Sequence, residues 1–174
     1  MKNEDVFIRG NISNLDYDAQ KATIIINTNE TRLISFCKLS QINQTSGEGF
    51  DDMVDMENLN EAELLDNIRR RYNMDKIFTF VGPTLIIVNP YKNIESVVSK
   101  NVLEIHQKNL LEKNFSLKSL GPHVYSITSA AFKQLVDSGK NQAIIISGES
   151  GAGKTENAKF AMKFITSLGY FRYC

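Results

Sequence analysis

The chain has 174 residues, of which 42% are hydrophobic and 23% charged, a composition typical of one soluble domain or of a modest domain with a small one appended. Lys and Arg number 20, as do Asp and Glu, so the formal net charge is zero and a nucleic-acid-binding protein is not expected. The N-terminus has no apolar run, and no stretch is long enough for a membrane span, so we expect a cytoplasmic protein. Cys37 and Cys174 form neither a metal-ligand pattern nor a disulfide framework.

The first part of the chain is rich in short β-forming segments. Residues 6–8, 23–26 and 33–36 contain β-branched and aromatic residues and are separated by Asn, Asp and Thr clusters. This pattern predicts a small β-rich, barrel-like unit over residues 1–45. Residues 41–52 are polar with two glycines and are interpreted as a linker, in which Asp51, Asp52 and nearby Asp55 are solvated and hold no metal.

A helix is predicted after the linker. Asn60 followed by Glu63 resembles a capping box, and positions 64, 68 and 72 repeat apolar or aromatic residues at helical spacing. Three arginines at positions 69–71 are expected to be solvated near the end of this helix, where cations suit the negative end of the dipole. Residues 77–81 and 85–88 then predict two strands around a Gly82-Pro83 turn.

Two further helices are indicated before the last third of the chain. Residues 96–114 show weak helical spacing. A clearer helix is predicted to begin at Pro122 and to end at residues 137–139, where Asp-Ser-Gly stops it. His106 and His123 have no second ligand at metal-binding spacing, so a structural role is favoured for both.

The pattern changes near residue 143. A continuous apolar run, Ala143 to Ile146, predicts a buried parallel strand that reaches Ser147. Beyond a glycine-rich loop, helical spacing predicts a helix over residues 154–168 that Gly169 ends. These elements predict an α/β fold, an incomplete mixed sheet of the P-loop NTPase type, preceded by the small β-rich unit.

The glycine-rich loop, residues 148–155, carries the clearest chemistry. It fits G-x-x-x-x-G-K-[ST] through Gly148, Gly153, Lys154 and Thr155. Glycines allow successive N–H groups to face one anion, and the following helix adds the positive end of its dipole. Lys154, the candidate catalytic residue, would reach the β- and γ-phosphates, and the Thr155 hydroxyl would bind Mg²⁺. Kinases, GTPases, ATPases and motors all use such a loop, so the reaction stays open.

The loop and its continuation, GESGAGKTEN over residues 148–157, closely resemble the P-loop of myosin motor domains. A second stretch, the Asn-Pro loop at residues 89–92, resembles the purine-side loop of the same family. Residues 51–73 and 122–125 also resemble that family, in the same order. The resemblance implies an ATP site formed by Gly148, Glu149, Ser150, Gly151, Ala152, Gly153, Lys154 and Thr155, with Asn89, Pro90, Tyr91 and Lys92 beside the adenine and ribose.

The resemblance covers about residues 50–168. It implies that residues 50–174 are the N-terminal part of a myosin-type motor domain, truncated after the P-loop helix. The parent would be an ATP-driven cytoskeletal motor of the myosin complex that binds the actin filament through parts absent from this sequence. The alternatives are a truncated non-motor fragment that binds nucleotide or acts only in interactions, or another P-loop NTPase. A GTPase would need an Asn-Lys-x-Asp motif, which the sequence lacks.

Two departures from the family pattern limit these expectations. The family places an aromatic residue on the purine where this chain has Val97, or Ser96 or Val98 in a shifted register. The Ser-Ser-Arg run of switch one and the Asp-x-x-Gly-Phe-Glu run of switch two do not occur. Phosphoryl transfer needs several positioned groups, so we expect binding of ATP without motor-like hydrolysis. An uncovered apolar face also predicts poor solubility.

Overall fold

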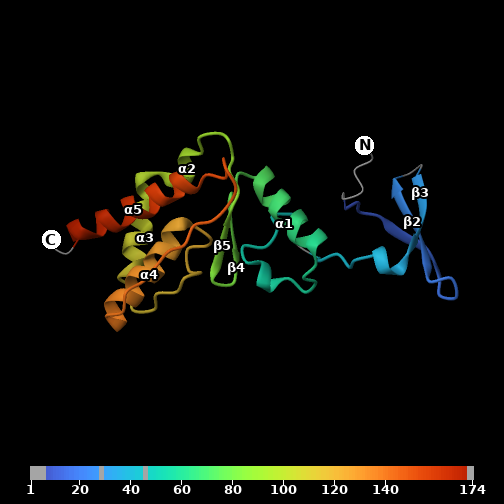
Figure 1. Cartoon of the computed structure of the whole chain (residues 1–174), viewed down its shortest axis with the longest axis horizontal. Helices are drawn as coiled ribbons and strands as arrows, with labels where there is room; N and C mark the ends of the chain where they lie inside the picture. The colour runs from blue at the N-terminus through green and yellow to red at the C-terminus, as the bar shows by residue number, and fades with distance from the viewer. Residues whose placement is uncertain (1–6, 28–29, 45–46, 172–174) are drawn as a thin grey trace.

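The structure is a computed structural model that describes residues 7–27, 30–44 and 47–171. A small sheet lies at one end, the first long helix lies in the middle, and a hairpin with a helical layer forms the other end (Figure 1). The mixture of helices and strands agrees with the predicted α/β class. None of the helices in these ranges is long and apolar enough to cross a membrane.

The first sheet has three antiparallel strands, β1 Asn11–Asp16, β2 Lys21–Asn27 and β3 Glu30–Ser35, in the order β1-β2-β3. Ala22 and Ile24 are its buried residues, whereas β1 is exposed throughout. Within the described residues the sheet is open, so the predicted barrel closure is not observed. The first strand also begins later than predicted. Phe7 and Ile8 lie outside any strand, and Val6 lies outside the described residues.

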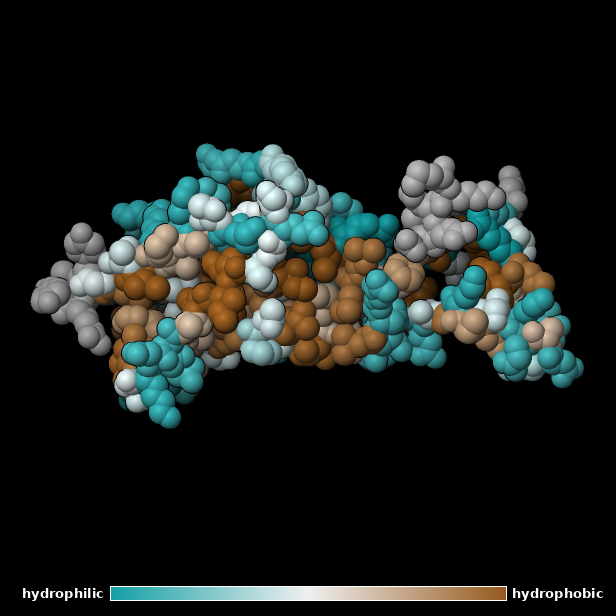
Figure 2. Space-filling view, viewed as in Figure 1, coloured by the Kyte–Doolittle hydropathy of each residue, from teal (hydrophilic) through white to brown (hydrophobic). Residues whose placement is uncertain are grey.

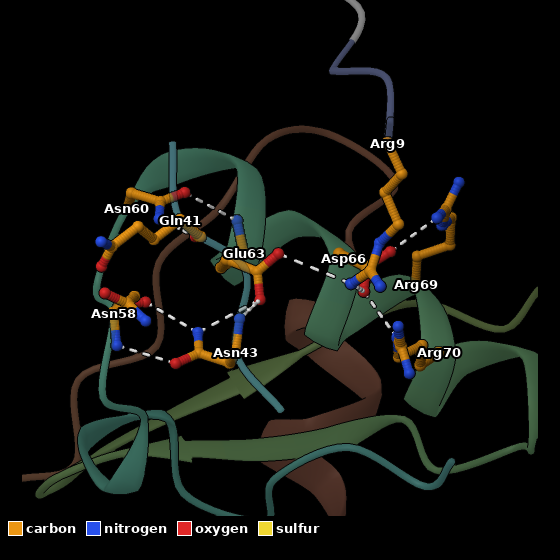
Figure 3. Close-up of polar contacts among 9 residues, drawn as sticks. All are labelled: Arg9, Gln41, Asn43, Asn58, Asn60, Glu63, Asp66, Arg69 and Arg70. Atoms are coloured by element: carbon orange, nitrogen blue, oxygen red, sulfur yellow. Dashed lines mark hydrogen bonds and ion pairs between the residues drawn. The ribbon is translucent and has the colours of Figure 1, made fainter. Parts of the chain in front are cut away.

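The polar segment after the sheet is packed against the next helix and is not a free linker. The backbone N–H of Asn43, a 5% exposed residue, donates to Glu63 Oε2 at 2.7 Å (Figure 3). The buried Asp52 accepts hydrogen bonds from the backbone N–H groups of Val54 and Gly82 and forms an ion pair with Lys118. The prediction of a solvated carboxylate was therefore wrong for Asp52.

The pKa of Asp52 reflects these contacts. Burial alone would raise that pKa, because water no longer stabilises the charged form. The hydrogen bonds from Lys118, Gly82 and Val54 outweigh burial and hold the pKa below its usual value. The carboxylate therefore stays charged and ties the segment after residue 50 to the hairpin turn.

Helix α1, Glu61–Asn73, begins as predicted at Asn60, whose side chain accepts the Glu63 N–H at 3.1 Å. Only half of the capping box forms, because the Glu63 carboxylate turns to Asn43 (Figure 3). One turn further, Asp66 accepts hydrogen bonds from three arginines. They are Arg9 at 2.7 Å, Arg69 at 2.6 Å and Arg70 at 2.5 Å. Arg9 thereby connects the segment before β1 to α1.

Arg71 departs from the predicted solvated cluster. It is 3% exposed, and its guanidinium donates to the Thr79 hydroxyl at 2.9 Å, to Asp51 at 2.6 Å and to the Phe78 carbonyl at 2.9 Å. A guanidinium has five donors in a fixed plane, so one side chain can join three segments. Arg71 holds the end of α1 against the following strand.

The predicted hairpin is confirmed. Strands β4, Phe78–Val81, and β5, Thr84–Ile87, pair antiparallel around the turn at Gly82 and Pro83. Four helices follow, α2 Glu95–Val98, α3 Lys100–Leu110, α4 Val124–Ser138 and α5 Lys154–Phe171. Pro122 lies two residues before α4, because His123 takes the N-cap position, and Gly139 ends α4 at φ +66°. Gly169 continues α5, contrary to prediction, and does not end it.

An aromatic cluster joins the hairpin to the helices. Tyr125 of α4 is fully buried and stacks on Phe164 of α5, with ring centroids 5.1 Å apart. His123 lies between Phe78 of β4 and Tyr125, at centroid distances of 4.6 and 4.5 Å, and His106 of α3 lies 4.9 Å from His123. The predicted structural role of both histidines is consistent with this burial.

The predicted central strand does not form. Residues 143–146 belong to no regular element, no described strand pairs with them, and the Ile145 side chain is 89% exposed. Ile144 and Ile146 instead line an apolar groove with side chains of α4 and α5, of about 370 Å³. Figure 2 shows apolar surface across the middle of this face of the molecule. A strand requires a partner for its ladder, and among the described residues β4 and β5 form a ladder only with each other. The isolated bridge of β4, between Phe80 and Asp52, does not involve residues 143–146.

We expect Arg71→Met to lower the free energy of unfolding by about 2–3 kcal/mol, because it leaves the Phe78 carbonyl without its donor and removes three hydrogen bonds. Urea denaturation measures this change. Arg69→Met is the matched control, since that side chain is 66% exposed and its ion pair should contribute less than about 1 kcal/mol. Equal losses in the two variants would contradict the buried role of Arg71.

We also expect stability to fall in acid through His123. Burial lowers the pKa of His123 from 6.5 to about 4, and His106 adds to the effect. Between those values the unfolded chain binds a proton that the folded chain does not. The free energy of unfolding therefore falls by up to about 3 kcal/mol as pH drops from 6.5 to 4. Above pH 6.5 the contribution of His123 to stability is complete.

His123→Asn separates this titration from helix capping. The His123 Nδ1 accepts the Tyr125 N–H at 3.0 Å, and an asparagine side chain can also accept at an N-cap without titrating in this range. Denaturation at several pH values between 7 and 4.5 should show a shallower pH dependence for the variant. An unchanged slope would exclude His123 as its source. His106 remains in both proteins and supplies part of the residual slope.

The exposed apolar face predicts low solubility that one substitution should relieve. Ile145→Lys places a charge at a side chain already in water, so the soluble fraction after centrifugation should rise while stability changes by less than about 0.5 kcal/mol. Ile144→Lys is the control, because Ile144 lines the groove and its substitution should destabilise the fold. If Ile145→Lys leaves the soluble fraction unchanged, this surface does not limit solubility.

Candidate nucleotide-binding site

Glycine is required at three positions of the glycine-rich loop. Gly148, Gly151 and Gly153 have φ angles of +150°, +80° and +91°, in a region that residues with a Cβ rarely adopt. A Cβ on Gly148 would also lie 3.2 Å from the Ala152 Cβ. The backbone of this loop therefore takes a shape that the G-x-x-x-x-G pattern permits.

The loop leads directly into the N-terminus of α5. A bond from the Ala152 N–H to the Glu149 carbonyl, at 3.2 Å, closes the turn, and the Asn157 N–H donates to the Gly153 carbonyl at 3.1 Å where α5 begins. Within the described residues, no protein acceptor receives the N–H groups of Gly153, Lys154 or Thr155. Unpaired N–H groups at the positive end of a helix dipole are suited to bind an anion.

Lys154, the first residue of α5, folds back over the loop. Its Nζ donates to the Gly148 carbonyl at 2.8 Å and to the Glu149 carbonyl at 2.7 Å. An ammonium group has three donors, so the two carbonyls leave one free. Thr155 follows in the first turn of α5 and is exposed. The structure thus places the predicted cation and hydroxyl at the same end of the helix.

The Asn-Pro loop lies against the glycine-rich loop, although 62 residues separate the two contacting positions. Asn89 Nδ2 donates to the Gly151 carbonyl at 2.7 Å. Asn89 Oδ1 accepts the Tyr91 N–H at 3.0 Å, and Tyr91 has a left-handed φ of +50° and a side chain that is 83% exposed. The structure therefore brings together the two stretches that the sequence singled out.

The remaining residues of the Asn-Pro loop turn toward α1. Lys92 forms an ion pair with Asp75 at 2.5 Å, and the Pro90 carbonyl accepts a hydrogen bond from the Tyr72 hydroxyl at 3.4 Å. Lys92 is therefore engaged away from the glycine-rich loop. Val97 packs against the hydrophobic core, and its carbonyl accepts a hydrogen bond from His123.

Sequence reasoning missed several supporting residues. Asn157 is 8% exposed, and its Nδ2 donates to the Gly153 carbonyl at 3.0 Å, which secures the junction of loop and helix. Its spacing of four residues from Gly153 was a usable signal, because Asn side chains bond to nearby backbone carbonyls. Tyr72 and Asp75 gave no such signal, since their partners lie far along the chain.

The donor set fits a phosphate group accompanied by Mg²⁺. The unpaired N–H groups and the Lys154 ammonium are suited to phosphate oxygens, and the Thr155 hydroxyl is the predicted Mg²⁺ ligand. The described residues contain no group of three or more His, Cys, Asp or Glu side chains that could hold a metal ion by themselves. Mg²⁺ in nucleotide sites is commonly held by one or two protein groups together with substrate phosphates.

Comparison with known proteins supplies the family. The myosin head (motor domain) family matches residues 50–170, so the chain belongs to the myosin motor domain family. Its relatives include Myosin-2 of Arabidopsis thaliana, 39% identical over 87% of this chain and 12% of that protein. Myosin-4 of Arabidopsis thaliana is 46% identical over 70% of this chain and 10% of that protein. Myosin-M heavy chain of Dictyostelium discoideum is 36% identical over 91% of this chain and 9% of that protein.

The chain corresponds to an N-terminal fragment of a myosin motor domain and spans about a tenth of the length of these relatives. This membership confirms the predicted resemblance. It also excludes the alternative that the glycine-rich loop belongs to a kinase or a small GTPase.

Proposed function

We propose that the chain binds ATP with Mg²⁺ through residues 148–155, with residues 89–92 beside the adenine and ribose. The observation that carries the proposal is the Asn89–Gly151 hydrogen bond of 2.7 Å, which joins the two predicted halves of one site. Family membership supports it, because nucleotide binding is implied for myosin motor domains. The three left-handed glycines and the unpaired N–H groups supply the matching phosphate chemistry.

The residues have separate tasks in this proposal. The N–H groups of Gly153, Lys154 and Thr155 bind phosphate oxygens. The Lys154 ammonium leaves the carbonyls of Gly148 and Glu149 and binds the β- and γ-phosphates. The exchange is favourable because hydrogen bonds between an ammonium and a phosphate are charge-assisted. Bound Mg²⁺ would neutralise phosphate charge, and the Thr155 hydroxyl would hold it.

Hydrolysis requires further groups that position water and stabilise the transferred phosphoryl group. The sequence contains neither switch string, so we propose binding without motor-like turnover by this chain. The whole protein of which it forms a part would be an ATP-driven motor that moves on actin filaments in the cytoskeleton. That activity depends on regions outside these 174 residues.

Lys154→Ala should weaken Mg·ATP binding roughly 10- to 100-fold, because it removes a charge-assisted contact to the phosphates. Isothermal titration calorimetry measures this affinity. Lys159→Ala is the matched control on the same helix, since Lys159 pairs only with Glu156 among the described residues and is exposed. Equal ATP affinity in the wild type and Lys154→Ala would contradict the proposed site.

Steady ATP turnover by the purified chain provides a separate test. We expect phosphate release near the background of a protein-free control, since the water-positioning groups are absent. Sustained turnover that Lys154→Ala abolishes would contradict the proposal of binding without hydrolysis, while leaving the site itself supported.

A further inference from the structure

The Asn89 side chain holds two backbone segments at once. Its Nδ2 donates to the Gly151 carbonyl at 2.7 Å, and its Oδ1 accepts the Tyr91 N–H at 3.0 Å. A single side-chain amide therefore donates to a carbonyl in the middle of the glycine-rich loop and stabilises the left-handed turn at Tyr91 in its own loop. Both hydrogen bonds lie within the protein, so neither requires a bound nucleotide base.

The bond to Gly151 fixes one particular peptide plane. The carbonyl of the Gly151–Ala152 peptide is held by Asn89, and its N–H is held by the Glu149 carbonyl at 3.2 Å. A trans peptide is planar, so restraining both ends sets its orientation. The next N–H groups along the chain, those of Gly153, Lys154 and Thr155, have no protein acceptor among the described residues and are available to an anion.

The residues that follow Asn89 are held by contacts with α1 and the residues just after it. The Tyr72 hydroxyl of α1 donates to the Pro90 carbonyl at 3.4 Å, and Lys92 pairs with Asp75 just after α1. On the other side, a Cβ placed on Gly153 would lie 4.0 Å from the Asn89 Cβ, so the two loops are in van der Waals range. Asn89 thus transmits a position set by α1 to a loop that has glycine at three flexible sites.

We propose that Asn89 is a positioning residue for phosphate, which acts through the Gly151 carbonyl and independently of the purine. The inference rests on the proposed ATP site. It differs from a role beside the base, because it predicts that Asn89 matters for a ligand that has no base.

The test compares Mg·ATP with Mg²⁺ and inorganic tripolyphosphate, which lacks base and ribose. Calorimetry on the full chain should show that Asn89→Ala weakens both ligands by a similar factor, about fivefold, the value for one lost hydrogen bond of about 1 kcal/mol. Asn101→Ala, at an exposed position of α3, is the matched control and should leave both affinities unchanged. Loss of ATP affinity alone would overturn the proposal in favour of a base contact, and no loss would overturn it altogether.

A measurement without ligand separates this inference from the proposed function. Hydrogen exchange of the unliganded chain should be faster in Asn89→Ala at the peptide covering residues 148–153, with exchange in β4 and β5 unchanged as evidence of an intact fold. Unchanged exchange at residues 148–153 would contradict the positioning role. If the wild type binds neither ligand, the proposed function fails, while the exchange result still decides whether Asn89 orders the loop.

Discussion

The stack of Tyr125 on Phe164 is the contact on which the position of the candidate site depends. It joins α4 to α5 inside a cluster that also contains His123 and Phe78, so the same core holds α5 against the β4–β5 hairpin. The glycine-rich loop precedes α5, and the Asn-Pro loop follows β5 within two residues. Both loops are therefore presented from one packed core, which allows the short Asn89–Gly151 bond to bridge 62 residues of sequence.

A second layer of polar contacts anchors the start of the motor-family region. Arg71 joins the end of α1 to β4 and to Asp51, and Asp52 joins the segment before α1 to the hairpin turn. Asp66 accepts hydrogen bonds from Arg9 and two arginines of α1, so a charged contact joins the segment before β1 to α1. The charges of Arg71 and Asp52 are buried, and a buried charge is costly unless a partner and hydrogen bonds compensate for its lost hydration.

Much of the local structure could be predicted, because its causes lie within a few residues. Asn60 as a cap, the Gly82-Pro83 turn, Gly139 at the end of α4 and the helix after the glycine-rich loop follow from capping, turn and glycine chemistry. The burial of Arg71 and Asp52 could not be predicted from local patterns. Arg71 contacts Asp51, 20 residues earlier, and Asp52 contacts Gly82, 30 residues later. Lys118, the ion-pair partner of Asp52, lies beyond three intervening α-helices. A run of three arginines carries no sign that one of them turns inward.

The failed strand at residues 143–146 has a different cause. Its apolar pattern is real, as the alternating exposure of Ile144, Ile145 and Ile146 shows, but a ladder forms only beside a second strand. The chain spans about a tenth of its relatives, and its described strands are already paired within their own sheets. The apolar pattern of a segment therefore indicates that it can form a strand, whereas whether it does so depends on a partner strand elsewhere in the sequence.

The most direct test of the account is a crystal structure of the chain with Mg²⁺ and a non-hydrolysable ATP analogue. We expect the β- and γ-phosphates within hydrogen-bond distance of the N–H groups of Gly153, Lys154 and Thr155. Lys154 Nζ should have moved to the phosphates, and the base should lie on the side of Asn89. Phosphates bound elsewhere, or a Lys154 that still contacts only the carbonyls of Gly148 and Glu149, would contradict the claim that the two loops form one nucleotide site.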